Sequence, residues 1–194
     1  MTDEIAPEAR GTLLLAFLAT SIRAATAVAV LLWFDLSPDA AELQRWTASE
    51  PPHFNLPDTA RANVALASRR GSVTIVHFFA TWCDSCRQEL PALNRLSERS
   101  GAAVMILAIS VAEPDVRVER FLQSMPLKFP VLLDRDRAIT KSWNVSTLPT
   151  SVVLDGELKA RLLVEGDCAW DTIDLGKLTK EVSTLKHVRH SMQD

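Results

Sequence analysis

Two cysteines separated by two residues are the feature of this sequence best suited to chemistry. Cys83 and Cys86 lie where an apolar stretch, residues 74–80, gives way to leucines at a three-to-four-residue period. The β-branched and aromatic residues of 74–80 indicate a buried central strand, and the leucine period indicates a helix. Cys83 then falls at the helix N-terminus, where free N–H groups favour a thiolate. Cys86 is one helical turn away, so the pair can cycle between dithiol and disulfide.

A metal site and an inert disulfide are the alternative interpretations of such a pair. Structural zinc needs four ligands, and the only further cysteine is Cys168. His187 and His190 are spaced like ligands but lie in a charged C-terminal stretch, so we expect a redox pair with no metal and no cofactor. An inert disulfide fits less well, because a strand-to-helix turn exposes the leading sulfur. Cys168 is interpreted as an idle or partly buried thiol, with a resolving or intermolecular role left open.

The surroundings of the pair resemble a known family. A Trp-Cys-Asp-Ser-Cys motif occupies residues 82–86, and a Glu-Leu-Pro motif follows at residues 89–91. Together they resemble the thioredoxin fold and, more narrowly, the TlpA/ResA-like group of membrane-anchored thiol–disulfide oxidoreductases. The resemblance implies an α/β fold with a central mixed sheet flanked by helices, and an N-terminal transmembrane helix.

The resemblance also assigns roles to residues next to the cysteines. In the ResA-like branch a glutamate three residues after the second cysteine helps to move protons, so Glu89 is predicted to accept and return a thiol proton. The alternative is an exposed helix glutamate. Asp84 and Ser85 are predicted to tune the redox potential. An acid beside Cys83 disfavours its thiolate and makes the couple more reducing, unless Asp84 only caps the helix and faces water.

A second motif belongs to the same resemblance. Leu148 and Pro149 begin a Leu-Pro-Thr sequence before an apolar strand, as in the cis-proline loop of the family. We therefore expect a cis peptide bond at Pro149, with an ordinary trans loop proline as the alternative. The backbone of Leu148 would pair with an extended client beside Cys83, and Trp82 would contribute to the same client-binding surface.

Composition limits the rest of the chain. At 194 residues, with 47% hydrophobic residues and a net charge of −3, the chain has room for one domain and an appendage, and it has no basic excess for nucleic-acid binding. We expect an N-terminal tail, an apolar segment, a polar linker, a thioredoxin-like domain and a polar tail, at residues 1–10, 11–34, 35–49, 50–186 and 187–194. Within the domain we expect a strand, a helix and a closing helix at residues 102–111, 114–122 and 170–185.

The apolar segment at residues 11–34 is predicted to be an uncleaved transmembrane anchor. As a helix it would be about 36 Å long, enough to cross a ~30 Å hydrocarbon core. Arg23 costs about 2.5–3.5 kcal/mol there, which the surrounding Leu, Ile, Phe and Val residues offset. A cleaved signal peptide and a buried core helix are the alternatives, and acidic residues at Asp3, Glu4 and Glu8 count against the signal peptide.

These features predict a thiol–disulfide oxidoreductase in which Cys83 attacks a substrate disulfide and Cys86 resolves the mixed disulfide. By the resemblance, the chain is a single-pass protein of a bacterial inner membrane with its catalytic domain in the periplasm. Electrons would come from a membrane thiol transporter of the DsbD/CcdA type, and cysteine-containing proteins such as apocytochrome c would be clients. A disulfide-donating oxidase and a general envelope thioredoxin remain open. A peroxidase with one attacking cysteine, a copper chaperone and a redox-inert binding module fit less well.

Overall fold

The computed structural model describes residues 41–190, with side chains described for residues 41–185. The predicted N-terminal tail and transmembrane anchor, residues 1–34, lie outside the described residues, as does the end of the predicted C-terminal tail. Among the described residues, no helix combines the length and the apolar character that crossing a membrane requires.

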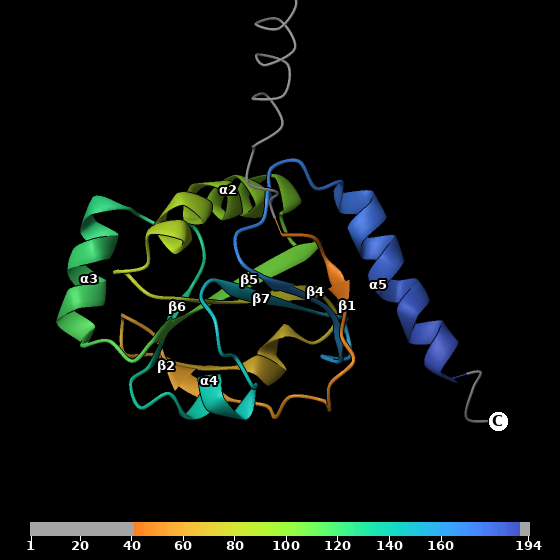
Figure 1. Ribbon diagram of the computed structural model, residues 1–194, viewed down its shortest axis with the longest axis horizontal. Coiled ribbons are helices and arrows are strands. Elements are labelled where there is room, and N and C mark those ends of the chain that lie inside the picture. The colour runs from red at the N-terminus through yellow and green to blue at the C-terminus, as the bar shows by residue number, and fades with distance from the viewer. Residues whose placement is uncertain (1–40, 191–194) are drawn as a thin grey trace, which may run out of the picture. The chain divides into compact units, whose positions relative to one another are not determined.

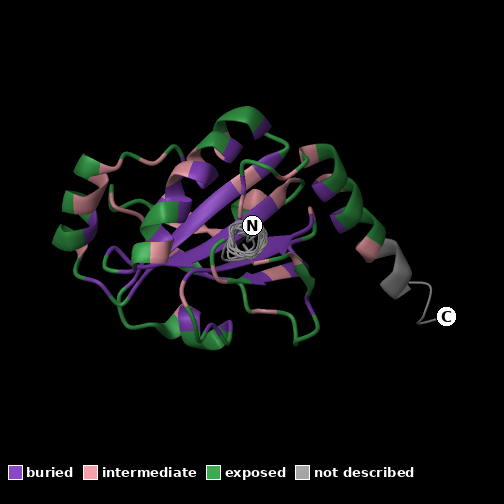
Figure 2. Ribbon diagram, turned by 45° about the horizontal axis from the view of Figure 1, so that its top comes forward, coloured by how far each residue is buried: buried purple, intermediate pink, exposed green. Residues whose placement is uncertain are grey.

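A six-stranded mixed sheet forms the centre of the fold (Figure 1). From one edge to the other, its strands are β1 (Gln44–Arg45), β8 (Ala160–Glu165), β7 (Thr150–Leu154), β4 (Val73–Phe79), β5 (Val104–Val111) and β6 (Val131–Asp134). Strands β4, β5 and β6 are parallel, whereas β7 runs antiparallel to β4 and to β8. The predicted central strand is β4, which is buried from Thr74 onward because both faces of the sheet are covered (Figure 2).

Helices and a small hairpin cover the two faces of this sheet. The helices are α2 (Asp84–Ser100), α3 (Asp115–Ser124), α4 (Ala138–Ser142) and α5 (Leu175–His190), with a short 3-10 helix at Leu66–Arg69. The hairpin consists of β2 (Asn55–Pro57) and β3 (Asn63–Ala65). One core cluster joins α2, α3 and α5 to the sheet, and a second joins the other sheet face to the 3-10 helix and the end of α4. The arrangement confirms the predicted α/β thioredoxin-like fold.

The main differences from the predicted boundaries lie at the two ends of the domain. Residues 44–45, expected in a linker, form edge strand β1, which pairs with β8, and the neighbouring Trp46 is buried. The closing helix, expected at residues 170–185, begins at Leu175 because the Asp174 carboxylate caps it by accepting the Lys177 N–H (2.9 Å). The helix extends to His190, so the first part of the expected C-terminal tail is helical.

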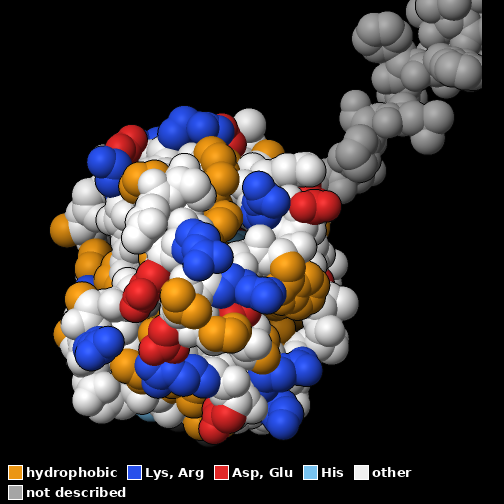
Figure 3. Space-filling view, turned by 90° about the vertical axis from the view of Figure 1, so that its left-hand side faces the viewer, with side chains coloured by type: hydrophobic (Ala, Val, Ile, Leu, Met, Phe, Trp, Pro, Cys, Tyr) orange, Lys and Arg blue, Asp and Glu red, His pale blue; other side chains and the backbone are white. Residues whose placement is uncertain are grey.

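The surface carries charges of both signs. On the face shown in Figure 3, Lys and Arg side chains are interspersed with Asp and Glu side chains and with small apolar areas. No single-sign patch dominates this face, as the small net charge of −3 leads one to expect.

Candidate active site

Cys83 and Cys86 form a disulfide at the N-terminus of α2. Cys83 is the N-cap residue in extended conformation, and its Sγ accepts the Cys86 N–H (3.2 Å). The Ser85 hydroxyl oxygen lies 3.4 Å from the same sulfur. Cys83 is 8% exposed and Cys86 is fully buried, so Cys83 is the outer residue of the pair. The helix terminus and the Cys86 N–H both favour negative charge on the Cys83 sulfur once the disulfide opens.

The Asp84 side chain is exposed to water. Its side chain is 88% exposed and lies 3.9 Å from the guanidinium of Arg87, a distance typical of a weak surface ion pair. The N-cap position belongs to Cys83, so Asp84 is the first residue of α2 and does not cap it through its side chain. Solvent screening therefore limits how strongly the Asp84 carboxylate can oppose a Cys83 thiolate.

A cavity next to the cis-proline loop includes Trp82, the residue before Cys83. The Leu148–Pro149 peptide bond is cis, as the resemblance predicted. Trp82, which is 63% exposed, and Leu148 both line this cavity of about 220 Å³. The other lining residues come from the end of β5, the start of α4 and the loop before β7: Val111, Ala112, Arg137, Thr140, Val145, Ser146 and Thr147. The structure thus brings together two of the three residues predicted to bind a client, Trp82 and Leu148, in one concave surface.

Glu89 is buried, so the alternative of an exposed helix glutamate is wrong. Its side chain is 3% exposed, and Oε1 accepts hydrogen bonds from the Trp170 indole N–H and from the Cys168 backbone N–H (3.3 Å). Oε2 is buried without a hydrogen-bond partner in the described part of the chain. Burial raises the pKa of Glu89 to about 8, with a further rise from the Asp167 charge, and the two hydrogen bonds oppose that rise.

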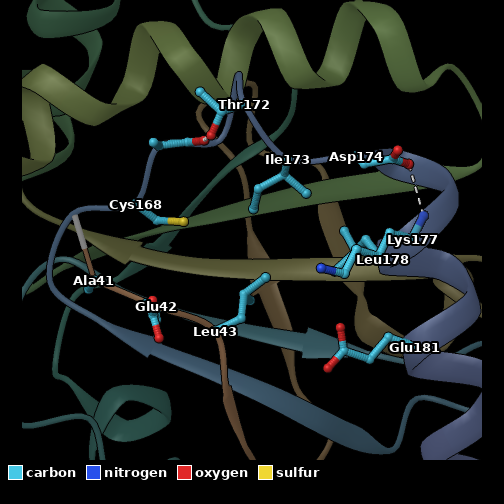
Figure 4. A pocket seen from close by; sticks show the side chains of 11 residues that line it. Ala41, Glu42, Leu43, Cys168, Thr172, Ile173, Asp174, Lys177, Leu178 and Glu181 are labelled. Atoms are coloured by element: carbon cyan, nitrogen blue, oxygen red, sulfur yellow. Dashed lines mark hydrogen bonds between the residues drawn. The ribbon is translucent and has the colours of Figure 1, made fainter. Parts of the chain in front are cut away.

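Cys168 lies next to Glu89 and borders a second cleft. Figure 4 shows its side chain near residues 41–43, at the end of a cleft of about 580 Å³ that extends to α5. Burial raises the pKa of the Cys168 thiol to about 12, and the Glu89 and Asp167 charges contribute. A thiol with that pKa is protonated at neutral pH and is a poor nucleophile.

Glu113 was not singled out from the sequence, yet it holds the turn that precedes Cys83. Its carboxylate accepts the Thr81 N–H (2.8 Å), the Thr81 hydroxyl (2.5 Å) and the Ser110 hydroxyl (2.9 Å), and it is 4% exposed. A sequence signal did exist. Because β4 and β5 are parallel neighbours, residues just after their ends meet at one edge of the sheet, which brings an acid after β5 close to the turn after β4.

His77 is the core histidine that its place in the central strand predicts. Its Nδ1 lies 2.9 Å from the Ser151 hydroxyl, and complete burial lowers its pKa to about 3. His77 is therefore neutral throughout the physiological range. Across the part of the chain with described side chains, no group of three or more His, Cys, Asp or Glu residues is arranged to hold a metal ion.

Comparison with known protein families shows to which family the chain belongs. A sequence model of the AhpC/TSA family matches residues 48–162, which is more than half of the chain. The chain belongs to the AhpC/TSA family. The matched region contains both cysteines of the disulfide, Glu89 and cis-Pro149, whereas Cys168 and Trp170 lie beyond its end.

Within the AhpC/TSA family, similar proteins share a stated activity. The chain is 34% identical over 119 residues to the thiol-disulfide oxidoreductase ResA of Bacillus subtilis, covering 61% of this chain and 66% of that protein. It is 32% identical over 129 residues to ResA of Geobacillus kaustophilus, covering 65% and 73%. A candidate thiol:disulfide interchange protein DsbE from Chlorobium tepidum superposes with a TM-score of 0.62 at 25% identity, covering 73% and 99%. The two matches cover about two thirds to three quarters of the length of these relatives. They support the predicted assignment as a thiol–disulfide oxidoreductase.

Proposed function

We propose that this protein is an extracytoplasmic thiol–disulfide oxidoreductase that reduces disulfides of client proteins through Cys83 and Cys86. The observation that carries the proposal is the asymmetry of the disulfide: Cys83 lies at a helix N-terminus and retains 8% exposure, whereas Cys86 is completely buried. Next to the cis-proline loop lies the cavity lined by Trp82 and Leu148. An accessible attacking sulfur and a protected resolving sulfur are what disulfide exchange requires.

The reaction follows from these positions. The Cys83 thiolate attacks a client disulfide, forms a mixed disulfide and releases one client sulfur as a thiolate. The Cys86 thiol gives its proton to the Glu89 carboxylate, and the resulting thiolate attacks Cys83 Sγ. This step forms the Cys83–Cys86 bond and releases the second client sulfur, which takes up a proton. Two electrons pass from the dithiol to the client disulfide.

Glu89 suits this proton transfer in position and in pKa. It lies one helical turn after Cys86 on the same helix face, inside the water-poor core. A pKa of about 8 means that the protonated and ionised forms are both populated near neutral pH. A general base with a pKa near the working pH can both accept and return a proton.

The reducing direction is part of the proposal. In the described part of the chain, the hydrogen-bond partners of the Cys83 sulfur are an amide and a hydroxyl, and neither carries positive charge. Strongly oxidising couples are those whose reduced thiolate is strongly stabilised, which cationic neighbours commonly achieve. We therefore expect the Cys83–Cys86 couple to have a moderate, reducing redox potential.

The cellular setting rests on the resemblance and on the relatives' names. We propose a single-pass anchor at residues 11–34 in a bacterial inner membrane, with the thioredoxin-like domain on the periplasmic side. A membrane thiol transporter of the DsbD/CcdA type would reduce the Cys83–Cys86 disulfide. Clients would be extracytoplasmic proteins with reducible cysteines, such as apocytochrome c.

The test uses two matched serine substitutions in the full-length protein. Reduction of insulin disulfides in the presence of a dithiol reductant measures turnover. Cys83→Ser removes the attacking sulfur and should abolish the activity, while Cys86→Ser should accumulate mixed disulfides visible as mass-shifted adducts. The proposal is wrong if the Cys83→Ser protein reduces insulin at the parent rate.

A further inference from the structure

Residues 166–170, the first part of the segment between β8 and α5, contact both parts of the candidate site. At its start, the Gly166 N–H donates to the carbonyl oxygen of Pro149 (2.9 Å). At its end, the Cys168 N–H and the Trp170 indole N–H both donate to Glu89 Oε1. Residues 166–170 therefore lie against the client-binding loop and against the buried carboxyl group at the same time.

The Trp170 indole is held in place from several directions. Its side chain is completely buried in the core cluster that joins α2 and α5 to the sheet. The backbone carbonyl oxygen of Trp170 accepts a hydrogen bond from the Arg99 guanidinium (2.7 Å). The side chain of the next residue, Asp171, accepts a hydrogen bond from Arg95. Arg95 and Arg99 lie one turn apart on α2, so the helix that carries Glu89 also fixes the backbone that carries Trp170.

The two oxygens of Glu89 are consequently inequivalent. Oε1 accepts two N–H groups, whereas Oε2 has no partner in the described part of the chain. An oxygen that already accepts two N–H groups is the poorer site for a proton, because a proton there would displace one of those donors. Oε2 is therefore the oxygen that gains and loses the proton.

In the described part of the chain, few charged or titratable groups face Glu89 and influence its ionisation. Asp167 and the Cys168 thiol face Glu89 from residues 166–170, and Cys86 faces it from α2. Strand β4 contributes His77 on the sheet face that α2 covers, and His77 is neutral because burial lowers its pKa to about 3. The Trp170 hydrogen bond is the largest influence that favours the ionised form of Glu89.

We propose that Trp170 is a positioning residue that holds Glu89 by Oε1, leaving Oε2 free to accept the proton of Cys86. In that step the S–H bond of Cys86 breaks and an O–H bond forms at Oε2, with no change in oxidation state. The inference rests on the proton-transfer role proposed for Glu89 and extends the machinery beyond the region that matches the family.

The test is the pH dependence of the resolving step in the full-length protein. The reduced protein is mixed with 5,5′-dithiobis(2-nitrobenzoate), and the second release of thionitrobenzoate reports attack of Cys86 on the Cys83 adduct. In the parent, this rate should rise with pH around a midpoint near the pKa of Glu89, about 8. Trp170→Phe removes the N–H and should raise the midpoint by about one unit, which slows the step about tenfold at pH 7.

The chain offers a matched control in Trp143. It is also buried, on the other side of the sheet, and its indole N–H donates to the Pro52 carbonyl oxygen (3.0 Å). Trp143→Phe makes the same deletion and should leave the midpoint unchanged. In a Glu89→Gln background, Trp170→Phe should change the rate no further, because its effect passes through Glu89.

The outcomes separate the inference from the function it extends. If Glu89→Gln removes the pH step but Trp170→Phe leaves the midpoint at the parent value, the positioning role of Trp170 is wrong and the role of Glu89 stands. If the step near pH 8 persists in Glu89→Gln, the proton-transfer role of Glu89 is wrong and the inference falls with it. Equal midpoint shifts in both tryptophan variants would show a packing effect and would also overturn it.

Discussion

Two buried glutamates flank the active-site turn, and their surroundings differ. Glu113 uses both carboxylate oxygens, which accept three donors from Thr81 and Ser110. Glu89 uses only Oε1, and its Oε2 is buried without a partner in the described residues. Both side chains are less than 5% exposed. The two side chains are equally buried, yet both oxygens of Glu113 accept hydrogen bonds and only one oxygen of Glu89 does so within the described residues.

The difference separates a structural role from a chemical one. Glu113 ties the residue two positions before Cys83 to the end of β5, so it fixes the position of the turn. Glu89 has a free oxygen and a pKa raised to about 8 by burial, so it can titrate where the protein works.

The largest expected effect comes from deleting the Glu113 carboxylate. Glu113→Ala leaves the Thr81 N–H and two hydroxyl groups buried without an acceptor, at about 1–3 kcal/mol each. The free energy of unfolding, measured by urea denaturation, should fall by about 4 kcal/mol or more. Glu113→Gln retains an acceptor oxygen and should lose clearly less. A loss below about 1 kcal/mol in Glu113→Ala would show that these bonds do not hold the turn.

Glu89 should instead make stability depend on pH. The unfolded chain releases this proton near pH 4.5 and the folded chain near pH 8, so between these values the folded state holds more protons. Stability then falls as pH rises, by about 1 kcal/mol per pH unit, or about 3 kcal/mol between pH 5 and pH 8.

Glu89→Gln isolates that contribution. The difference in unfolding free energy between the parent and Glu89→Gln, from urea titrations at several pH values, should decrease from pH 5 to pH 8. A parent-minus-Glu89→Gln difference that is constant over this range would mean that Glu89 does not titrate there.

The smallest effect is expected at Asp84, the exposed acid of the same turn. Because water screens its 88% exposed side chain, Asp84→Asn should raise the redox potential of the cysteine pair by only about 10 mV. Thiol-buffer equilibration followed by alkylation measures it. An increase of about 50 mV or more would show that Asp84 acts directly on the Cys83 sulfur and contributes strongly to a reducing potential.

The parts of this site that were predictable depend on local signals. The helix N-terminus at Cys83 follows from a strand-like run and a leucine period within one stretch, and the cis bond at Pro149 follows from a short motif. The burial of Glu89 was not predictable in this way. Its partner Trp170 lies 81 positions away in the sequence, and no periodicity links a helix residue to a distant loop.

Edge strand β1 was missed for a related reason. It has two exposed residues, Gln44 and Arg45, and neither favours a strand by itself. Its pairing with β8 is decided by the free edge of that strand and by the burial of Trp46 next to it. Contacts made only after the chain has folded override weak local preference in such short segments.

The measurement that tests the central claim most directly is the equilibrium redox potential of Cys83 and Cys86 in the full-length protein. Incubation in defined thiol buffers, alkylation and mass analysis give the fraction oxidised. The account predicts a reducing couple, between thioredoxin's ~−270 mV and the glutaredoxin range of about −200 to −230 mV. A value near the ~−120 mV of DsbA would contradict it, because such a couple donates disulfides to its clients.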